Sequence, residues 1–199
     1  ICIPSGNHDM DRLARVLHGD ELKVAFAFLL TMPGAPFIYY GDEIGLRYVE
    51  NLVSVEGGYN RTGSRSPTQW NFGFSNASPE KLYIPTDDKP NSPTVEDQMK
   101  DPNSLYYEVK KLIALRREHS ALLSDGNIEF VSDGADGSPL AYIRSSADEK
   151  ILVVVNPADR EAVLTVPGSW QQNLYQIGGA VVAENGKLVI PPKSANLLR

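Results

Sequence analysis

The spacing of apolar residues divides the chain into an α/β part and an all-β part. A short strand ends at Cys2-Ile3, and a helix that is apolar on nearly every side follows over 21–32, with Asp20 as its N-cap. Pro36–Tyr40 is then a second short apolar run rich in strand-forming residues. A strand, a buried helix and a buried strand in this order predict a parallel β–α–β unit.

A second helix is predicted from Asp101, as N-cap, through Pro102 at the first helical position to about Glu118. Its apolar positions recur at helical spacing and predict one buried stripe, formed by Leu105, Val109, Leu112 and Ile113. The preceding segment, 45–100, has no long periodic pattern. Because it carries Trp, Tyr and Arg residues, we expect an ordered loop that forms part of a site.

Beyond Gly126 the pattern changes to short strands separated by polar turns. We expect seven strands, over 127–132, 139–145, 150–156, 161–167, 173–177, 187–191 and 194–199. The sequence therefore predicts two domains, an α/β part over 1–122 and a small antiparallel β domain over 123–199.

Charge and hydropathy narrow the classes of partner. A formal net charge of -6 over 199 residues argues against nucleic acid or an anionic membrane as the main partner. The longest apolar stretch, Val24–Met32, is too short to cross a bilayer. The pairs Lys110-Lys111 and Arg116-Arg117 are interpreted as the solvated face of the second helix. Nothing in the sequence indicates a cellular compartment.

The segment SGNHDMDRLAR, Ser5–Arg15, follows the end of the first strand. Loops at the carboxyl ends of parallel strands carry ligand-binding and catalytic groups. Asp9 and its neighbour His8 could therefore bind vicinal sugar hydroxyls, and a carboxylate could stabilise positive charge on a substrate. The same residues would also serve as a polar turn ahead of a helix.

Four stretches resemble segments of the alpha-amylase family, glycoside hydrolase family thirteen, and they occur in that family's order. They are SGNHD, TMPGAPFIYYGDEIGL (31–46), NRTGSRSPTQWN (60–71), and GFSNASPEKLYIP (73–85) followed by VEDQMKDPNSLYYEVKKLIALRREHSAL (95–122). The third resembles the R-S/T-P-M-Q-W loop of the α-glucosidase and trehalose synthase branches, with Thr68 in place of methionine. The resemblance implies the C-terminal part of a TIM (β/α)8 barrel, with a long active-site loop over 45–100, followed by a small antiparallel β-sandwich domain.

The resemblance also implies roles for individual residues. Asp9 corresponds to the family's third carboxylate, which stabilises the transition state, and His8 to a contact with the same sugar. Arg65 corresponds to an arginine that binds substrate by closing the pocket, although a salt bridge that staples the loop is an equal alternative. Asn7 and Arg12 would support the site, and the strand-end acids Asp42-Glu43 would be structural.

The family's nucleophile and acid/base lie on earlier strands and correspond to no residue of this sequence. We therefore expect this segment to be inactive alone and to need the rest of the barrel as its partner. The implied reaction is retaining cleavage or transfer at an α-glucosidic bond of short α-glucan oligosaccharides. The alternatives are a trehalose synthase-type isomerase and a non-catalytic relative of the kind that partners membrane transporters.

Other candidate sites carry less weight. Starch binding by the β domain would rest on Trp170 and Tyr175 alone. His18 and His119 have no metal-ligating partner at useful spacing, and the turn after Asp133 lacks the length of a calcium loop. The sequence implies no metal site and no cofactor.

Overall fold

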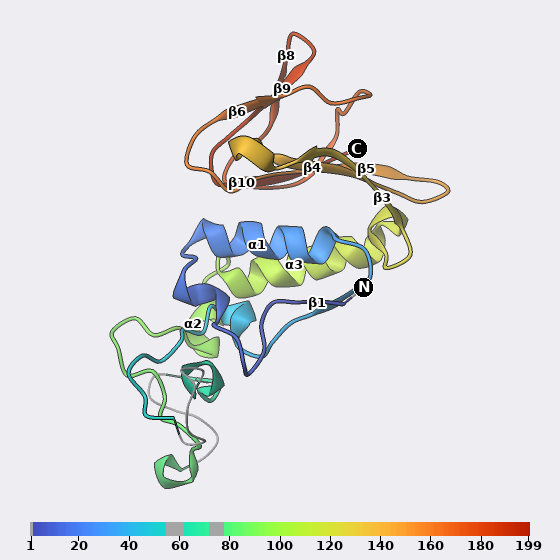
Figure 1. Ribbon diagram of the computed structural model, residues 1–199. Coiled ribbons are helices and arrows are strands. Elements are labelled where there is room, and N and C mark those ends of the chain that lie inside the picture. The colour runs from blue at the N-terminus through green and yellow to red at the C-terminus, as the bar shows by residue number, and fades with distance from the viewer. Residues whose placement is uncertain (1, 55–61, 72–77) are drawn as a thin grey trace. The chain divides into compact units, whose positions relative to one another are not determined.

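The computed structural model describes residues 2–54, 62–71 and 78–199. These residues form two compact units (Figure 1). The site unit comprises Cys2–His18 and Pro36–Lys110, and the sandwich unit comprises Gly19–Ala35 and Lys111–Arg199. Among the described residues, no helix is both long and apolar enough to span a membrane.

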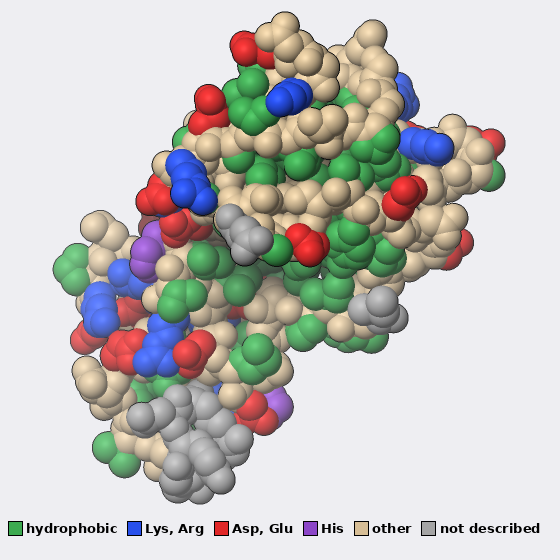
Figure 2. Space-filling view, turned by 45° about the horizontal axis from the view of Figure 1, so that its top comes forward, with side chains coloured by type: hydrophobic (Ala, Val, Ile, Leu, Met, Phe, Trp, Pro, Cys, Tyr) green, Lys and Arg blue, Asp and Glu red, His purple; other side chains and the backbone are tan. Residues whose placement is uncertain are grey.

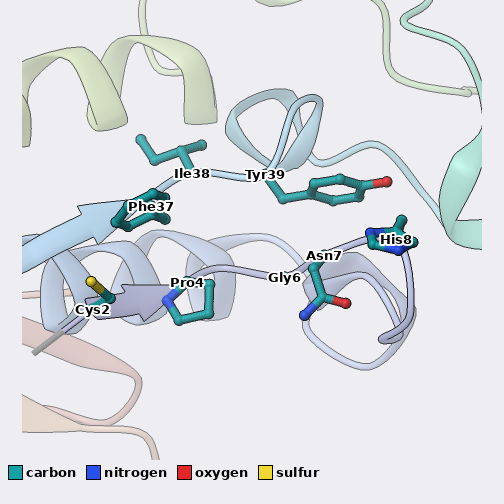
Figure 3. A pocket seen from close by; sticks show the side chains of 8 residues that line it. All are labelled: Cys2, Pro4, Gly6, Asn7, His8, Phe37, Ile38 and Tyr39. Atoms are coloured by element: carbon teal, nitrogen blue, oxygen red, sulfur yellow. The ribbon is translucent and has the colours of Figure 1, made fainter.

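The site unit is built around two short neighbouring strands, β1 (Cys2–Pro4) and β2 (Ala35–Phe37). Figure 3 shows the two strands running in the same direction, as the sequence pattern predicts. The predicted extension of β2 to Tyr40 is wrong, because side chains take over the backbone bonds beyond Phe37. The Tyr39 amide donates to Ser5 Oγ at 2.9 Å, and the Tyr40 carbonyl accepts from Arg12 Nη1 at 2.8 Å.

Ahead of α3 (Leu105–Glu118), the other described residues of the site unit form irregular chain with short helical turns. These are η1 (Leu13–Arg15), η2 (Asp42–Ile44), η3 (Thr62–Arg65), η4 (Pro79–Lys81) and the α-helix α2 (Val95–Lys100). The sequence pattern missed α2. Thr94 is its N-cap, and its hydroxyl accepts a hydrogen bond from the Asp97 amide at 3.1 Å.

The two long helices differ from prediction at their starts. Helix α1 covers Asp20–Thr31, so Asp20 is its first residue and Gly19, with a φ of 56°, is the N-cap. Helix α3 covers Leu105–Glu118 and begins four residues after the predicted N-cap, Asp101. The Asp101 carboxylate accepts instead from the Asn103 amide, within a turn. Ile113 does not belong to the buried stripe, since it is 38% exposed.

The sandwich unit contains two antiparallel sheets. The five-stranded sheet has the order β3-β4-β5-β10-β7, over Asn127–Asp133, Leu140–Ser145, Lys150–Asn156, Ser194–Leu198 and Asn173–Ile177. The three-stranded sheet has the order β6-β9-β8, over Ala162–Leu164, Lys187–Ile190 and Val182–Glu184. All seven predicted strands are present, and β8 is additional.

The five-stranded sheet is covered on both faces. On one face, Leu152 and Val154 of β5 pack with Leu188 and Ile190 of β9, which closes the sandwich. On the other face lies α1, which contacts β10, β5 and β7 (Figure 1). This explains why β5 is apolar at five consecutive positions, Ile151–Val155, instead of alternating.

Two buried arginines bind the C-terminal end of α1. Arg116 of α3 donates to the carbonyl oxygens of Leu30 (2.7 Å), Met32 (2.7 Å) and Gly34 (2.6 Å). Arg144 of β4 donates to the carbonyl oxygen of Thr31 and to three carbonyls of the 123–127 segment. A helix ends with unpaired carbonyls and a partial negative charge, and both are satisfied here by guanidinium groups. The interpretation of Arg116 as a solvated residue is therefore wrong.

Candidate functional site

A cavity lies where the two strands of the site unit end. Its volume is ≈ 410 Å³, and Figure 3 shows the side chains that line it, from Cys2, Pro4, Gly6, Asn7, His8, Phe37, Ile38 and Tyr39. Two of the candidate site residues, Asn7 and His8, are among them. The cavity therefore lies beside the loop that the sequence singled out.

Asn7 fixes the turn that carries His8 and Asp9. Its side-chain oxygen accepts from the Asp9 amide at 2.8 Å, and its carbonyl accepts from the Met10 amide at 3.3 Å. His8 Nε2 lies 3.4 Å from Asp9 Oδ2, and the two side chains are 65% and 45% exposed. The turn therefore fixes the backbone at His8 and Asp9, and both side chains are exposed.

Arg65 joins this turn from a segment far along the chain. Its Nη2 lies 3.1 Å from Asp9 Oδ1, and its Nε donates to the carbonyl of His8 at 3.0 Å. Its Nη1 donates to the Tyr83 hydroxyl at 3.1 Å, and its side chain is only 13% exposed. The structure therefore brings together Asp9, His8 and Arg65, three of the predicted site residues.

Arg12, the fifth predicted residue, lies beneath the turn and is fully buried. Its Nη1 bonds Asp42 Oδ1 at 2.9 Å, and its guanidinium lies 4.7 Å and 4.9 Å from the ring centroids of Tyr39 and Tyr40. Ser5 Oγ donates to Asp42 Oδ2 at 2.7 Å. Burial raises the pKa of the Asp42 carboxyl, and the contacts with Ser5 and Arg12 offset part of that rise.

The two tyrosines of this cluster hold the loop that carries Arg65. The Tyr39 hydroxyl donates to the carbonyl of Ser64 at 3.3 Å, and the Tyr40 hydroxyl donates to the carbonyl of Ser66 at 2.7 Å. Burial raises the pKa of Tyr39 to about 12, so its hydroxyl remains a donor throughout the neutral range. The end of β2 is thereby connected to the 62–66 segment.

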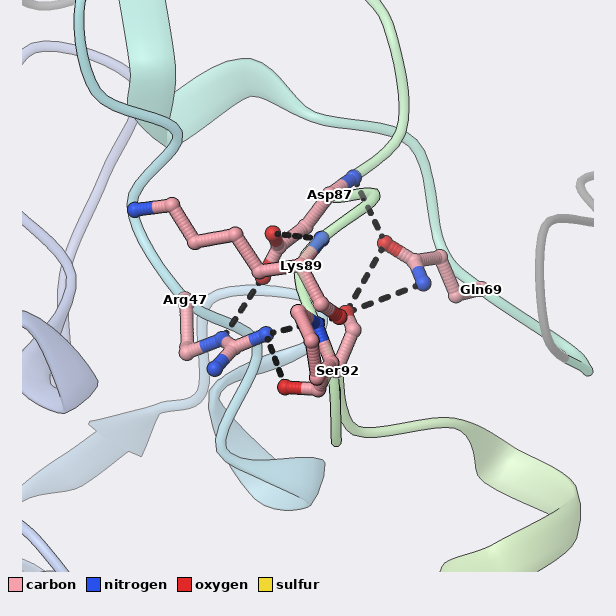
Figure 4. A network of polar contacts seen from close by, with 6 residues as sticks. Arg47, Gln69, Asp87, Lys89 and Ser92 are labelled. Carbon is pink, nitrogen blue, oxygen red and sulfur yellow. Dashed lines mark hydrogen bonds and ion pairs between the residues drawn. The ribbon is translucent and has the colours of Figure 1, made fainter.

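A second polar network, which the sequence analysis missed, fixes the outer part of the long loop (Figure 4). Arg47 Nε bonds the buried Asp87 carboxylate at 2.6 Å. The side chain of Gln69, which is fully buried, accepts from the Asp87 amide at 2.9 Å and donates to Ser92 Oγ at 3.1 Å. Gln69 belongs to the R-S-P-T-Q-W stretch, and its place in that motif was the available signal.

In the described ranges, the candidate metal-binding and starch-binding residues of the sequence analysis do not form a site. No cluster of three or more His, Cys, Asp or Glu residues able to hold a metal is present in that part of the chain. His119 pairs instead with Glu149 at 2.7 Å. Tyr175 is buried beneath Lys111, and Trp170 packs against the sandwich core, so neither is an exposed sugar platform.

Charge is mixed on the molecular surface drawn in Figure 2. Red acidic and blue basic side chains lie interspersed there, and neither sign forms a continuous area among the residues that this face displays.

Comparison with known proteins places these features in a family. The alpha-amylase catalytic domain matches residues 3–126, and the maltogenic amylase C-terminal domain matches residues 128–189. A trehalose synthase from Pimelobacter sp. is 36% identical over 159 residues, which cover 73% of this chain and 26% of that protein. A glucan 1,6-alpha-glucosidase from Streptococcus pneumoniae is 33% identical over 207 residues, which cover 85% of this chain and 38% of that protein.

A solved structure gives the same architecture. The trehalose-6-phosphate hydrolase of Bacillus licheniformis superposes on 99% of this chain with a TM-score of 0.81 at 23% identity, and the match covers 42% of its chain. The chain thus spans less than half the length of these proteins. The predicted fold, part of a (β/α)8 barrel followed by an antiparallel β-sandwich domain, is confirmed, and the chain belongs to the alpha-amylase family.

Proposed function

We propose that this chain supplies one carboxylate of the active site of a retaining glycosidase or transglycosidase that acts on α-glucosidic bonds of short α-gluco-oligosaccharides. The observation that carries the proposal is the contact of Arg65 with Asp9, 56 residues away in sequence, and with His8, whose side chain lines the cavity. Residues 1–122 would belong to the barrel and residues 123–199 to a C-terminal β domain.

Asp9 would stabilise the transition state. Oxocarbenium-like charge develops on the sugar ring during cleavage, and an ionised carboxylate against the ring favours that charge over the neutral ground state. The exposed His8 side chain would hydrogen-bond a hydroxyl of the same sugar. Asn7 would hold the turn and Arg12 the base of the loop, so neither needs to touch substrate.

The nucleophile and the general acid/base would come from parts of the barrel that this sequence does not include. The segment alone is therefore expected to be inactive, because carboxylates that act as a unit lose nearly the whole rate when one is missing. Expressing residues 1–199 alone and assaying release of glucose from maltose tests this point directly.

Substitution of Asp9 in the full-length natural protein is the central test. Asp9→Asn should lower kcat/KM on maltose by roughly 10²- to 10³-fold, the cost of removing one group that stabilises developing charge. Asp11→Asn is the matched control, since Asp11 lies in the same loop but is engaged by Arg15 at 2.7 Å. Equal activity of Asp9→Asn and wild type would refute the proposed role.

The relatives favour a second candidate activity. Several of the matched proteins are named trehalose synthases, so an isomerase that returns the glucosyl group to the retained glucose is an alternative to hydrolysis. Incubation of the full-length protein with maltose separates the two, because trehalose marks the isomerase and glucose the hydrolase. Absence of both products would favour the non-catalytic class.

A further inference from the structure

A second cavity lies within the sandwich unit, between the segment that follows α3 and the turn that joins β4 to β5. Its volume is ≈ 270 Å³, and it is lined by residues of 120–127 and 145–147. The lining residues that bear on its chemistry are Ser120, Leu123, Asp125, Asn127, Ser145 and Ser146. We infer that this cavity binds one glucopyranosyl unit, at a site separate from the one described above.

The first wall of the cavity is held in place from beneath by Arg144. This residue is fully buried and donates to three carbonyl oxygens of the 120–127 segment, those of Leu123 (2.7 Å), Gly126 (3.2 Å) and Asn127 (3.1 Å). The backbone here is closely packed as well, because a Cβ added at Gly126 would collide with the Ala121 carbonyl. The shape of this wall is therefore fixed before any ligand binds.

Glu149 ties the second wall to the first. Its carboxylate accepts from the Ala121 amide at 3.2 Å, and its carbonyl accepts from the Ser146 amide at 2.9 Å. The hydroxyls of Ser120 and Ser146, one from each wall, lie 2.7 Å apart. Since both walls are held by the protein itself, a ligand would not have to order either segment, and preformed sites bind at lower entropic cost.

The polar groups of the cavity are of the kind that hydrogen-bond sugar hydroxyls. Asn127 of β3 and Ser145 of β4 are opposite partners in the sheet, so their side chains lie on the same face. Asp125 and Asn127 are both exposed. Hydroxyl and amide groups donate and accept, and a carboxylate accepts only. Together they offer donors and acceptors at close spacing, which matches a ring of vicinal hydroxyls.

The same groups exclude other classes of ligand. Asp125 is the one charged residue among those that line the cavity, and its carboxylate repels phosphate or sulfate. A single carboxylate is far from the six to eight or so oxygen ligands that Ca²⁺ takes. In the part of the chain that the structure describes, no cluster of His, Cys, Asp or Glu could hold a metal. The ligand is therefore a neutral, polyhydroxylated molecule.

Size sets the length of the ligand. Pockets for drug-sized molecules have volumes of about 300–1,000 Å³, so ≈ 270 Å³ suits one hexose ring. Leu123, which is 41% exposed, offers an apolar surface to the C–H face of that ring. No lining residue is aromatic, so binding depends on hydrogen bonds and a Kd of about millimolar is expected. Only the choice of glucose among the hexoses rests on the proposed function.

Hydrogen exchange of the full-length protein tests the inference, because it reports on each wall separately. The amides of Gly126 and Ser146 donate to the carbonyl oxygens of Leu123 and Glu149, within the two walls. Glucose at about ten times its Kd should slow the exchange of both amides by up to about tenfold. Glycerol at the same concentration is the control for a non-specific polyol effect and should slow neither amide.

A glucosyl unit could be free glucose or the end of an oligosaccharide. Maltotriose distinguishes these sources, and it is measured on Asp9→Asn so that turnover is suppressed. Slowing by both sugars assigns the cavity to the end of a glucan chain. Slowing by glucose alone assigns it to free glucose.

Three variants locate the binding. Asn127→Leu removes the side-chain amide at similar size and should raise the Kd for glucose by about tenfold or more, through the loss of two hydrogen bonds. Asp125→Asn keeps the shape, removes the charged acceptor and should raise the Kd by about fivefold. Glu129→Leu is the matched control, because Glu129 is an exposed residue of β3 that does not line the cavity, and it should leave the Kd unchanged.

The outcomes separate this inference from the proposed function. Asp125→Asn carries the test if circular dichroism shows that Asn127→Leu fails to fold. The inference is overturned if glucose slows neither amide, if glycerol slows them equally, or if the Kd is the same in all three variants. A full-length protein inactive on every α-glucoside would overturn the proposed function and leave the exchange result as it stands.

Discussion

Replacement of Arg116 by methionine is expected to loosen the C-terminal end of α1. Arg116 is 8% exposed, and its guanidinium donates to the carbonyl oxygens of Leu30, Met32 and Gly34. Burial lowers the pKa of Arg116, which reflects the cost of keeping its charge away from water. Methionine has a similar volume and no donor, so the substitution removes the three bonds and leaves the packing volume largely filled.

The expected magnitude follows from these contacts. A hydrogen bond from a charged donor contributes about 1.5 kcal/mol at the low end, so three contribute roughly 4.5 kcal/mol. The attraction between a cation and a helix C-terminus adds about 0.5 kcal/mol. Removal of a buried charge and burial of the apolar methionine stabilise the variant by about 2 kcal/mol, which offsets part of this loss. We expect a net loss of about 3 kcal/mol.

Hydrogen exchange of the α1 amides measures this loss locally, in the full-length protein. The amide of Met32, which donates to the Phe28 carbonyl at 3.2 Å, should exchange about 10²-fold faster in Arg116→Met. Arg117→Met is the control, because Arg117 is the exposed neighbour on the same helix and should change the free energy of opening by less than about 0.5 kcal/mol. Equal exchange rates in the two variants would refute the reasoning.

Three other predictions concern single contacts. Gln69→Leu leaves the buried Asp87 amide without its acceptor and should lower the free energy of unfolding by about 2 kcal/mol in urea titrations; an unchanged midpoint would contradict this. Burial raises the pKa of Glu149, but the hydrogen bonds from His119 and the Ala121 amide, with the charges of His119 and Arg199, outweigh it, so the pKa is lowered from 4.5. Its contribution to stability is therefore present above pH 4.5 and lost as the pH falls below it, and Glu149→Gln should flatten the acid limb of melting temperature against pH. At Gly63 an added Cβ would collide with the Val49 carbonyl, so Gly63→Ala should cost about 2 kcal/mol in thermal unfolding, and a neutral result would show that the loop can shift.

The sequence predicted the elements whose apolar pattern is long or dense. The bounds of β5 and β7 match the prediction, because each is a short run of apolar, strand-forming residues bounded by polar turns, and in β5 five such residues are consecutive. The edge strand β8 was not predicted, because all three of its residues are exposed and no apolar pattern indicates a strand there. The start of α3 was predicted too early, because the Asp101 side chain caps a local turn and not the helix.

The candidate site shows a different limit. Motif order identified Asp9, His8 and Arg65 as separate candidates, but no spacing rule relates residues 56 positions apart, so their contact could come only from the structure. The role of Arg116 was misread for a similar reason. Helical periodicity places neighbouring arginines on adjacent faces, and it cannot tell which of them meets the open carbonyls of another helix.

The arginine contacts at the end of α1 bear on how this protein could be recombined with its relatives. Arg144 belongs to β4, yet it binds the carbonyl oxygen of Thr31, and the five-stranded sheet lies against α1. In a chimera that exchanges the β-sandwich at a crossover near residue 123, α1 would pack against the sheet of another protein and would lose the contact with Arg144. A chimera that takes α1, Arg116 and the β-sandwich with Arg144 from the same parent, with one junction ahead of Gly19, would keep the helix together with both arginines that bind its C-terminal end.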